Sequence, residues 1–230
     1  MKKYAIRCGS RTGSTLLCEL LRSTNRCGYP QEYANSDMIR QYSEQIGLPS
    51  TASWKEYRNK LFNKRSTENS VFGIKVIGTT SQMLNFEAMD IKPTHWIRLH
   101  REDKILQAVS RYKAWKTNIW HRNHKTVVPP VPYDFGKIDW CLKEIIEEET
   151  EFNDFFADKD HISINYELDL VEDPEQTVVA VLTHMGISIE DVPELKSSRI
   201  IHRDESSYRM RDQYLKQAVW ADYEEWRPKT

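Results

Sequence analysis

Seven residues near the N-terminus have the side chains and backbone freedom that an anion site needs. They follow the apolar run Tyr4–Cys8 and read Gly9-Ser10-Arg11-Thr12-Gly13-Ser14-Thr15, where a helical pattern begins at Ser14. A helix that starts after a tight loop directs its first backbone N–H groups toward an anion. Glycine permits close backbone approach, hydroxyl groups add donors, and arginine adds a permanent positive charge. The pattern predicts a phosphate site, and the alternative for the loop alone is a polar turn with a helix-capping Ser or Thr.

The spacing within this loop excludes two common phosphate motifs. A Walker A loop needs GxxxxGK[ST], but here the two glycines are four residues apart and Ser14 stands where the lysine would be. A cysteine-based phosphatase loop needs an arginine six residues after the cysteine, and that position from Cys8 is again Ser14. Both observations weaken kinase, ATPase and phosphatase interpretations. They leave Arg11 as the cation available to a leaving phosphate.

A second candidate anion point lies near the middle of the chain. Arg101 is expected at the end of a strand and Ser110 inside the helix that follows. Since a helix rises roughly 1.5 Å per residue, an arginine side chain lying along the first turns could share one anion with Ser110. Such a pair would suit a phosphate at the far end of a nucleotide. Taken alone, the two residues favour a surface arginine and a neutral helix serine. Together with the first loop, they favour a phosphate site.

Strands alternating with helical patterns must position these two points. Four runs predict strands: Tyr4–Cys8, Val71–Ile77, Thr94–Leu99 and His161–Tyr166. Besides the helix that begins at Ser14, helices are expected at about Asp103–Lys116, Ile138–Phe156, Pro174–His184 and Ser206–Tyr223, with an extended proline-containing segment at Lys125–Pro132. The alternation predicts an α/β fold with a mostly parallel central sheet flanked by helices.

Length and composition favour one domain spanning residues 1–230. The chain has 230 residues, 39% of them hydrophobic, which is enough to bury a core. We recognise no signal peptide and no run of about 18 apolar residues, so we expect a cytoplasmic protein without a membrane span. The four cysteines have no CxxC pairing, and we expect reduced thiols and no metal site.

The net charge of −1 argues against a nucleic-acid binder, but the charges are unevenly distributed. Residues 1–26 and 92–125 are strongly basic, which suggests two anion-binding points. Residues 144–160 hold eight acids against Lys159, and we interpret them as a solvated helix face. A late basic cluster could contact a phosphate or simply be a solvated helix start; it comprises Arg199, His202, Arg203, Arg209 and Arg211.

Five motifs in order resemble a known enzyme family. They are Arg11-Thr12-Gly13-Ser14-Thr15 with Leu16-Leu17-Cys18-Glu19-Leu20-Leu21, Gly28-Tyr29-Pro30-Gln31-Glu32-Tyr33, Phe72-Gly73-Ile74-Lys75, Arg101-Glu102-Asp103-Lys104 with Gln107-Ala108-Val109-Ser110, and Tyr166-Glu167-x-Leu. Their order and spacing resemble the bacterial sulfotransferases that use 3′-phosphoadenosine 5′-phosphosulfate (PAPS). The resemblance covers about residues 5–185.

The resemblance implies a P-loop-like sulfotransferase fold, PAPS as the sulfuryl donor, and no metal. It assigns Arg11 to Thr15 of the first loop to the 5′-phosphosulfate, and Arg101 with Ser110 to the 3′-phosphate. We expect Gly9 and Ser10, which complete the loop, to contact the donor as well. The resemblance names Glu32 as the general base, with Arg11 stabilising the leaving bisphosphate. The resemblance is also compatible with a homodimer. Ser10 and Thr12 stand where the family commonly has proline and serine, and Thr12 keeps a hydroxyl group.

The acceptor side cannot be aligned by eye, so the hydroxyl acceptor stays open between a sugar, a glycolipid and another small alcohol. Lys75 could reach a sulfonate or an acceptor, or could face solvent. An aromatic wall is a further hypothesis, with core packing and solvent exposure as its alternative; it would consist of Tyr112, Trp115, Trp120, His121 and His124. One of these histidines could replace Glu32 as base. Two alternative functions also stay open: a nucleotide-binding scaffold without chemistry, and a P-loop nucleotide kinase.

Overall fold

A four-stranded parallel sheet forms the centre of the described structure. The computed structural model describes residues 1–49, 52–78, 80–120, 127–190, 192–197 and 205–218. Within them the strands are β1 (Lys2–Cys8), β2 (Val71–Ile77), β3 (His95–His100) and β4 (His161–Asn165), in the spatial order β2-β1-β3-β4. All three neighbouring pairs are parallel. The predicted α/β fold with a mostly parallel sheet is confirmed, and each predicted strand is found within two residues of its expected bounds.

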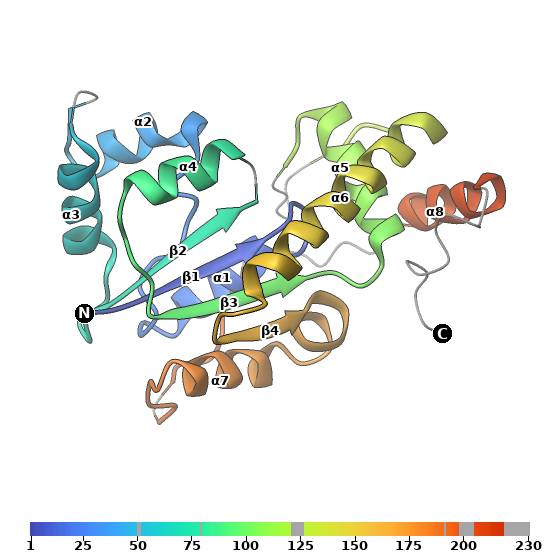
Figure 1. Ribbon diagram of the computed structural model, residues 1–230. Coiled ribbons are helices and arrows are strands. Elements are labelled where there is room, and N and C mark those ends of the chain that lie inside the picture. The colour runs from blue at the N-terminus through green and yellow to red at the C-terminus, as the bar shows by residue number, and fades with distance from the viewer. Residues whose placement is uncertain (50–51, 79, 121–126, 191, 198–204, 219–230) are drawn as a thin grey trace.

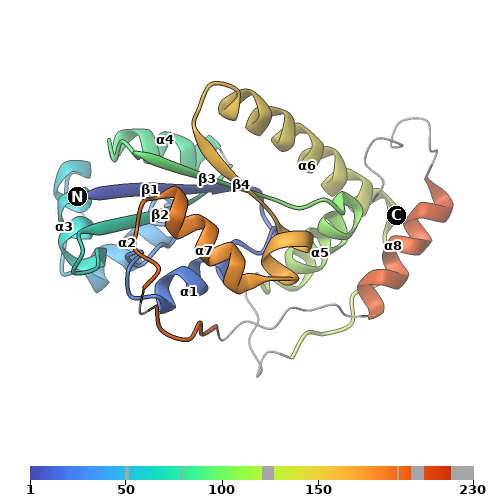
Figure 2. The same cartoon turned by 90° about the horizontal axis from the view of Figure 1, so that it is seen from below.

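Helices cover both faces of this sheet (Figures 1 and 2). On one face lie α1 (Ser14–Ser23) and α7 (Pro174–His184), which pack on Tyr4, Ile6 and Cys8 of β1. On the other face, α2 (Ser36–Gln45), α3 (Trp54–Arg65) and α4 (Thr80–Ala88) pack with Ala5 of β1 and with Phe72, Ile74 and Val76 of β2. Because successive residues of β1 point to opposite faces, this single strand contributes to both cores.

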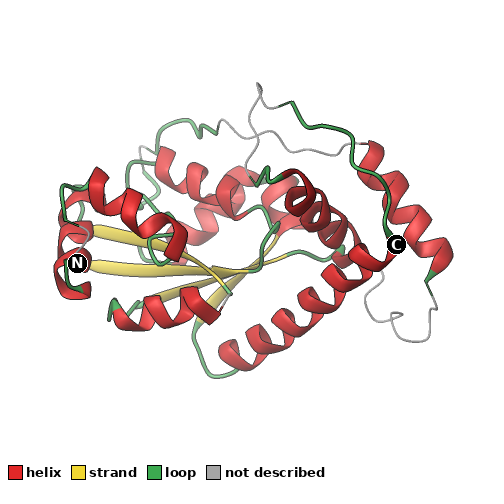
Figure 3. Ribbon diagram, turned by 90° about the horizontal axis from the view of Figure 1, so that it is seen from above, coloured by secondary structure: helices red, strands yellow, loops and turns green. Residues whose placement is uncertain are grey.

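A third apolar cluster lies beyond the sheet, where α5 (Lys104–Thr117), α6 (Phe135–Phe156) and α8 (Glu205–Gln217) pack together. The C-terminal half of α6 also reaches back over the sheet, since Phe155 packs edge-on against Trp96 of β3. Figure 3 shows the strands enclosed between helices on either side. The extended segment expected before α6 is found for residues 127–132, which form no regular element.

The parallel register brings three chain segments to the same edge of the sheet. Cys8 pairs with Leu99, and His100 pairs with Asn165. Therefore the loop after β1, the turn after β3 and the π-helix η1 (Tyr166–Val171) after β4 begin side by side. The carboxyl edge of a parallel sheet is the usual ligand position in open α/β folds.

Candidate active site

The loop after β1 leads into the N-terminus of α1 at the carboxyl edge of the sheet. Gly13 is the N-cap of α1 and has a φ of 81°, and no side chain caps the helix. Arg11 also has a positive φ, of 65°. The first backbone N–H groups of α1 therefore have no capping side chain and can serve a bound anion, as the sequence predicted for a phosphate loop.

Two loop hydroxyls hold the loop itself. Thr12 is 1% exposed and donates to the Gly9 carbonyl at 2.9 Å. Ser10 Oγ accepts from Arg111 Nε at 2.7 Å, and the Ser10 carbonyl accepts from Gln107 Nε2 at 2.8 Å. These contacts brace the loop, from within through Thr12 and from α5 through Ser10. The assignment of Ser10 and Thr12 to the donor site stays a prediction.

Gln107 and Arg111 are supports that sequence analysis missed. They lie four residues apart and so on one face of α5, and Arg111 is fixed in turn by Glu148 of α6 at 2.6 Å. Their spacing was visible in the sequence. Nothing in it, however, showed that this face of α5 would meet the loop.

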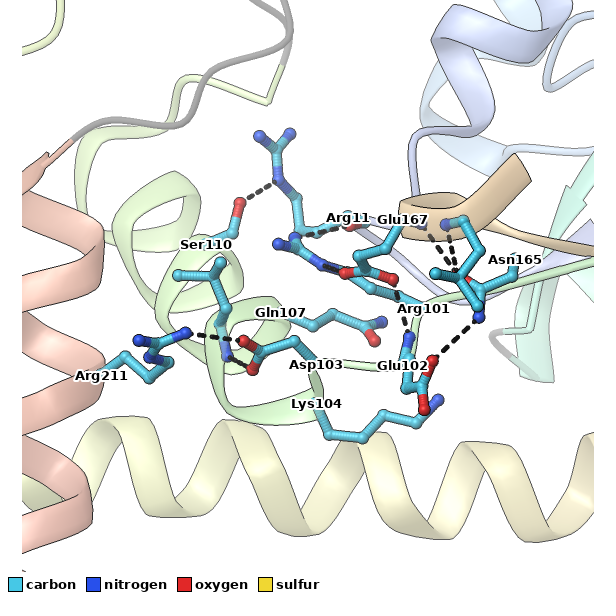
Figure 4. A network of polar contacts seen from close by, with 12 residues as sticks. Arg11, Arg101, Glu102, Asp103, Lys104, Gln107, Ser110, Asn165, Glu167 and Arg211 are labelled. Atoms are coloured by element: carbon cyan, nitrogen blue, oxygen red, sulfur yellow. Dashed lines mark hydrogen bonds and ion pairs between the residues drawn. The ribbon is translucent and has the colours of Figure 1, made fainter. Parts of the chain in front are cut away.

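Arg11, Arg101 and Ser110 come together in one polar network (Figure 4). Arg11 Nε donates to Ser110 Oγ at 3.0 Å, and its guanidinium also donates to the Trp120 carbonyl. Arg101 Nη1 donates to the Arg11 carbonyl at 3.4 Å, and Arg101 Nε pairs with Glu167 of η1 at 2.8 Å. Arg101 and Ser110 thus flank Arg11 from two sides. The Arg11 guanidinium lies against α5 rather than over the start of α1.

Glu167 holds the turn after β3 in place. It accepts from the backbone N–H of Glu102 at 2.9 Å as well as from Arg101. The Arg101 guanidinium also lies 4.9 Å from the centre of the Tyr166 ring. Tyr166 and Glu167, which follow β4, therefore both contact Arg101 and orient its side chain toward the loop.

Glu32 and Lys75 form a buried ion pair beside the loop. Lys75 Nζ lies 2.7 Å from Glu32 Oε1, with only 6% and 12% of the two side chains exposed. The same ammonium donates to Thr15 Oγ1 at 3.3 Å. Lys75 is therefore not a solvent-facing strand lysine. Its ammonium contacts both Glu32, the proposed base, and Thr15, the second residue of α1.

Further donors fix the carboxylate of Glu32. Its Oε2 accepts from Asn35 Nδ2 at 2.9 Å and from Gln82 Nε2 at 3.4 Å. Burial is the largest single effect and acts to lower the pKa of Lys75, but the charge and hydrogen bond of Glu32, together with the nearby Cys18 and Cys8, outweigh burial and raise the pKa overall. Lys75 therefore carries an ammonium at neutral pH.

The three described members of the hypothetical aromatic wall do not share one surface, since Tyr112 is buried while Trp115 and Trp120 are exposed. Tyr112 is 2% exposed in the third apolar cluster, and its hydroxyl donates to the Pro132 carbonyl at 2.8 Å, so it is a packing residue. Trp115 and Trp120 are 51% and 39% exposed. Lys137 Nζ lies 5.3 Å from the centre of the Trp115 ring. His121 and His124 lie outside the described residues.

The interpretation of residues 144–160 as a solvated face is wrong for its central carboxylates. Glu149 is 8% exposed and pairs with Arg98 at 3.1 Å and Lys104 at 2.9 Å, while Glu148 pairs with Arg111. Part of the basic segment 92–125 is thus neutralised by α6 rather than available to a ligand. Charge counts along the chain could not show this internal pairing.

The late basic cluster is only partly described, since Arg199, His202 and Arg203 lie outside the described residues. Arg211 of α8 pairs with Asp103 at 3.2 Å, and Asp103 also caps α5 by accepting from Leu106 N at 2.7 Å. Arg209 is largely exposed and lies 3.8 Å from Glu205. Arg211 therefore docks α8 against the start of α5.

The comparison with protein families decides what kind of enzyme this site belongs to. The sequence profile described as Stf0 sulphotransferase matches residues 3–217. The chain belongs to this family. It is thus a sulfotransferase, and the family resemblance seen in its motifs is confirmed.

Named relatives agree with this assignment. The chain is 26% identical over 208 residues to the trehalose 2-sulfotransferase of Mycobacterium tuberculosis, covering 72% of this chain and 78% of that protein. It is 27% identical over 155 residues to the trehalose 2-sulfotransferase of Mycolicibacterium smegmatis, covering 51% of this chain and 58% of that protein.

Solved structures show the same fold. The sulfotransferase domain of the Synechococcus PCC 7002 olefin synthase superposes with a TM-score of 0.53 at 10% identity, covering 96% of this chain and 90% of that one. The sulfotransferase domain from the curacin biosynthetic pathway gives 0.50 at 13% identity, covering 95% and 99%. These likenesses confirm the expected P-loop-like sulfotransferase fold.

In the part of the chain that the structure describes, no cluster of three His, Cys, Asp or Glu side chains could hold a metal ion. Nor does any described helix have the length and apolar character needed to cross a membrane.

Proposed function

We propose that this sulfotransferase moves a sulfuryl group from PAPS to a hydroxyl of a carbohydrate acceptor, with Glu32 as the general base. The observation that carries the proposal is the Lys75 ammonium, which contacts both Glu32 Oε1 and Thr15 Oγ1. It puts a buried carboxylate next to the start of the phosphate loop helix. A base and a leaving-group site must lie this close for an in-line transfer.

The donor half of the site would use two anchors. The N–H groups at the start of α1, with Ser14 and Thr15, would bind the 5′-phosphosulfate, since this helix end has no side-chain cap. Arg101 and Ser110, which flank Arg11 at the same sheet edge, would bind the 3′-phosphate. Arg11 belongs to the loop and contacts Ser110 of the second anchor, and it would stabilise the charge that develops on the leaving bisphosphate.

The acceptor half would use Glu32. Its carboxylate takes the proton of the acceptor hydroxyl while the acceptor oxygen forms a bond to sulfur. The bond between sulfur and the 5′-phosphate oxygen breaks, and its electron pair stays on that oxygen. Adenosine 3′,5′-bisphosphate and the sulfated acceptor are the products. The carbohydrate class is supported by the two relatives, which are trehalose 2-sulfotransferases.

The variant Glu32→Gln tests the base. It keeps the shape of the side chain and the contacts from Asn35 and Gln82 but cannot accept the proton, so turnover with a hydroxyl acceptor should fall about 10²–10⁴-fold. Binding of adenosine 3′,5′-bisphosphate should stay within a few-fold. The measurement is transfer of radiolabelled sulfate from PAPS to trehalose and other sugars, with the exposed Glu87→Gln as a matched control. Equal turnover of Glu32→Gln and the native protein would remove Glu32 from this role.

The alternative of a binding protein without chemistry predicts a different result. Such a protein would bind the bisphosphate and transfer sulfate to none of the sugars or alcohols offered. The buried, donor-held carboxylate beside the loop favours the enzyme. The kinase alternative lacks the Walker lysine, and Lys75 does not replace it within the loop, because it comes from β2.

A further inference from the structure

The Lys75–Glu32 pair presents a chemical conflict that the proposed function must resolve. Glu32 Oε1 lies 2.7 Å from the Lys75 ammonium, and Oε2 accepts from Asn35 and Gln82. A carboxylate stabilised by an opposite charge and by hydrogen bonds is a weak base. In this arrangement Glu32 is therefore poorly prepared to take a proton.

The position of Lys75 offers a way to release the base. Its Nζ already lies 3.3 Å from Thr15 Oγ1, at the start of the helix that would bind the phosphosulfate. An ammonium has three donors on a flexible stem and can change partners over a short distance. A buried ammonium is costly without a counter-charge, so it leaves one anion only when another is supplied.

We propose that Lys75 is an exchangeable counter-ion, paired with Glu32 in the free protein and with the sulfonate of PAPS once the donor is bound. This inference rests on the proposed function. Donor binding supplies the second anion beside Thr15, Lys75 turns to it, and Glu32 Oε1 becomes open to the acceptor hydroxyl. The base is thereby activated only when a sulfuryl group is present to be transferred. The product bisphosphate has no sulfonate and leaves Lys75 with Glu32.

The exchange makes a prediction about binding that needs no turnover. PAPS carries a sulfonate that adenosine 3′,5′-bisphosphate lacks, so the change in the ratio of their affinities between a variant and the native protein reports the contact of Lys75 with that group. Lys75→Met should lower the preference for PAPS about tenfold or more, which is the size expected for one charge-assisted hydrogen bond. Glu32→Gln should raise the preference about tenfold, because Lys75 no longer has to leave a carboxylate.

The double variant that combines Lys75→Met with Glu32→Gln distinguishes two explanations. Glu32 acts either by holding Lys75 or by directly repelling the sulfonate. If Glu32 acts through Lys75, adding Glu32→Gln to Lys75→Met changes the preference by less than about twofold, within the usual error of additive effects. If Glu32 merely repels the sulfonate, the same addition raises the preference as much as it does in the native background, and the proposal is overturned.

The experiment is calorimetric titration of the full chain with each nucleotide in the absence of acceptor. Binding of the bisphosphate shows that each variant is folded. Lys75→Gln is a second variant in case Lys75→Met is unstable. The matched control is Lys55→Met, which removes the charge of an exposed lysine. An unchanged preference in Lys75→Met and Lys75→Gln contradicts the exchange but leaves the proposed function intact. A native protein that binds neither nucleotide contradicts the proposed function itself.

Discussion

Among single residues, Gly13 is a loop position that both its backbone and its surroundings restrict to glycine. Its φ of 81° disfavours any side chain, and a Cβ there would overlap the ring of Tyr166. The left-handed conformation alone costs a non-glycine residue roughly 1–2 kcal/mol. Gly13 thus has two requirements, one from the backbone and one from η1, which packs against the loop.

We expect Gly13→Ala to lose bisphosphate binding and to lower the free energy of unfolding by more than the backbone cost. Gly47→Ala is the matched control, because Gly47 has a φ of 72° with no atom within 4 Å of an added Cβ. The control should lose only about 1–2 kcal/mol and keep binding. Chemical denaturation and nucleotide titration of both variants give the comparison. Equal losses in the two would mean that contact with Tyr166 plays no part.

At the scale of elements, α6 is held over α5 and the sheet by buried charge. Glu149 lies between Arg98 of β3 and Lys104 of α5, so removing its charge would leave two cations in a poorly solvated position. Burial lowers the pKa of Lys104 even though Glu149 opposes that change. One helix residue therefore secures two other elements close to the second anchor.

Glu149→Gln should reduce the free energy of unfolding by about 3 kcal/mol, the usual cost of breaking a buried ion pair from one side. The exposed Glu147→Gln on the same helix should change it by less than about 0.5 kcal/mol. Urea unfolding curves of the two variants measure the difference. If both behave alike, the acidic segment is a solvated face after all.

Elements differed in how well the sequence predicted them. The segment β1, loop and α1 was predictable because an apolar run, two glycines and an amphipathic pattern follow one another directly. α2 and α3 were not placed individually, since each buries only two residues and their patterns are mostly polar. The contacts of Lys75 could not be predicted from the sequence, because its partners Glu32 and Thr15 lie 43 and 60 residues away along the chain.

For the whole molecule, the reactivity of the cysteine thiols reports whether the described core is packed. All four cysteines are free and buried. Burial raises the pKa of Cys8 to about 11, of Cys18 to about 12, and of Cys27 and Cys141 to about 11. In the unfolded chain a thiol has a pKa of about 8.5.

We expect all four thiols to react with a disulfide reagent at pH 8 only as the protein unfolds, because the thiolate is the reactive form. Above a pH of about 8.5 the unfolded chain binds fewer protons than the folded one, so stability should fall as pH rises toward 11. Thiol release against time, with and without denaturant, checks the first point. A fast release of one or more thiols from the native protein would contradict it.

We propose that the loop and the second anchor together bind a nucleotide with a phosphate at both ends. Thermal unfolding with adenosine 3′,5′-bisphosphate, adenosine 5′-monophosphate and ATP tests this binding. A ligand at 100 times its Kd adds about 2.7 kcal/mol, which for a chain of this length raises Tm by about 5–10 °C. At equal concentrations the bisphosphate should raise Tm far more than the monophosphate or ATP. Equal shifts for the three nucleotides, or a larger one for ATP, would contradict the claim.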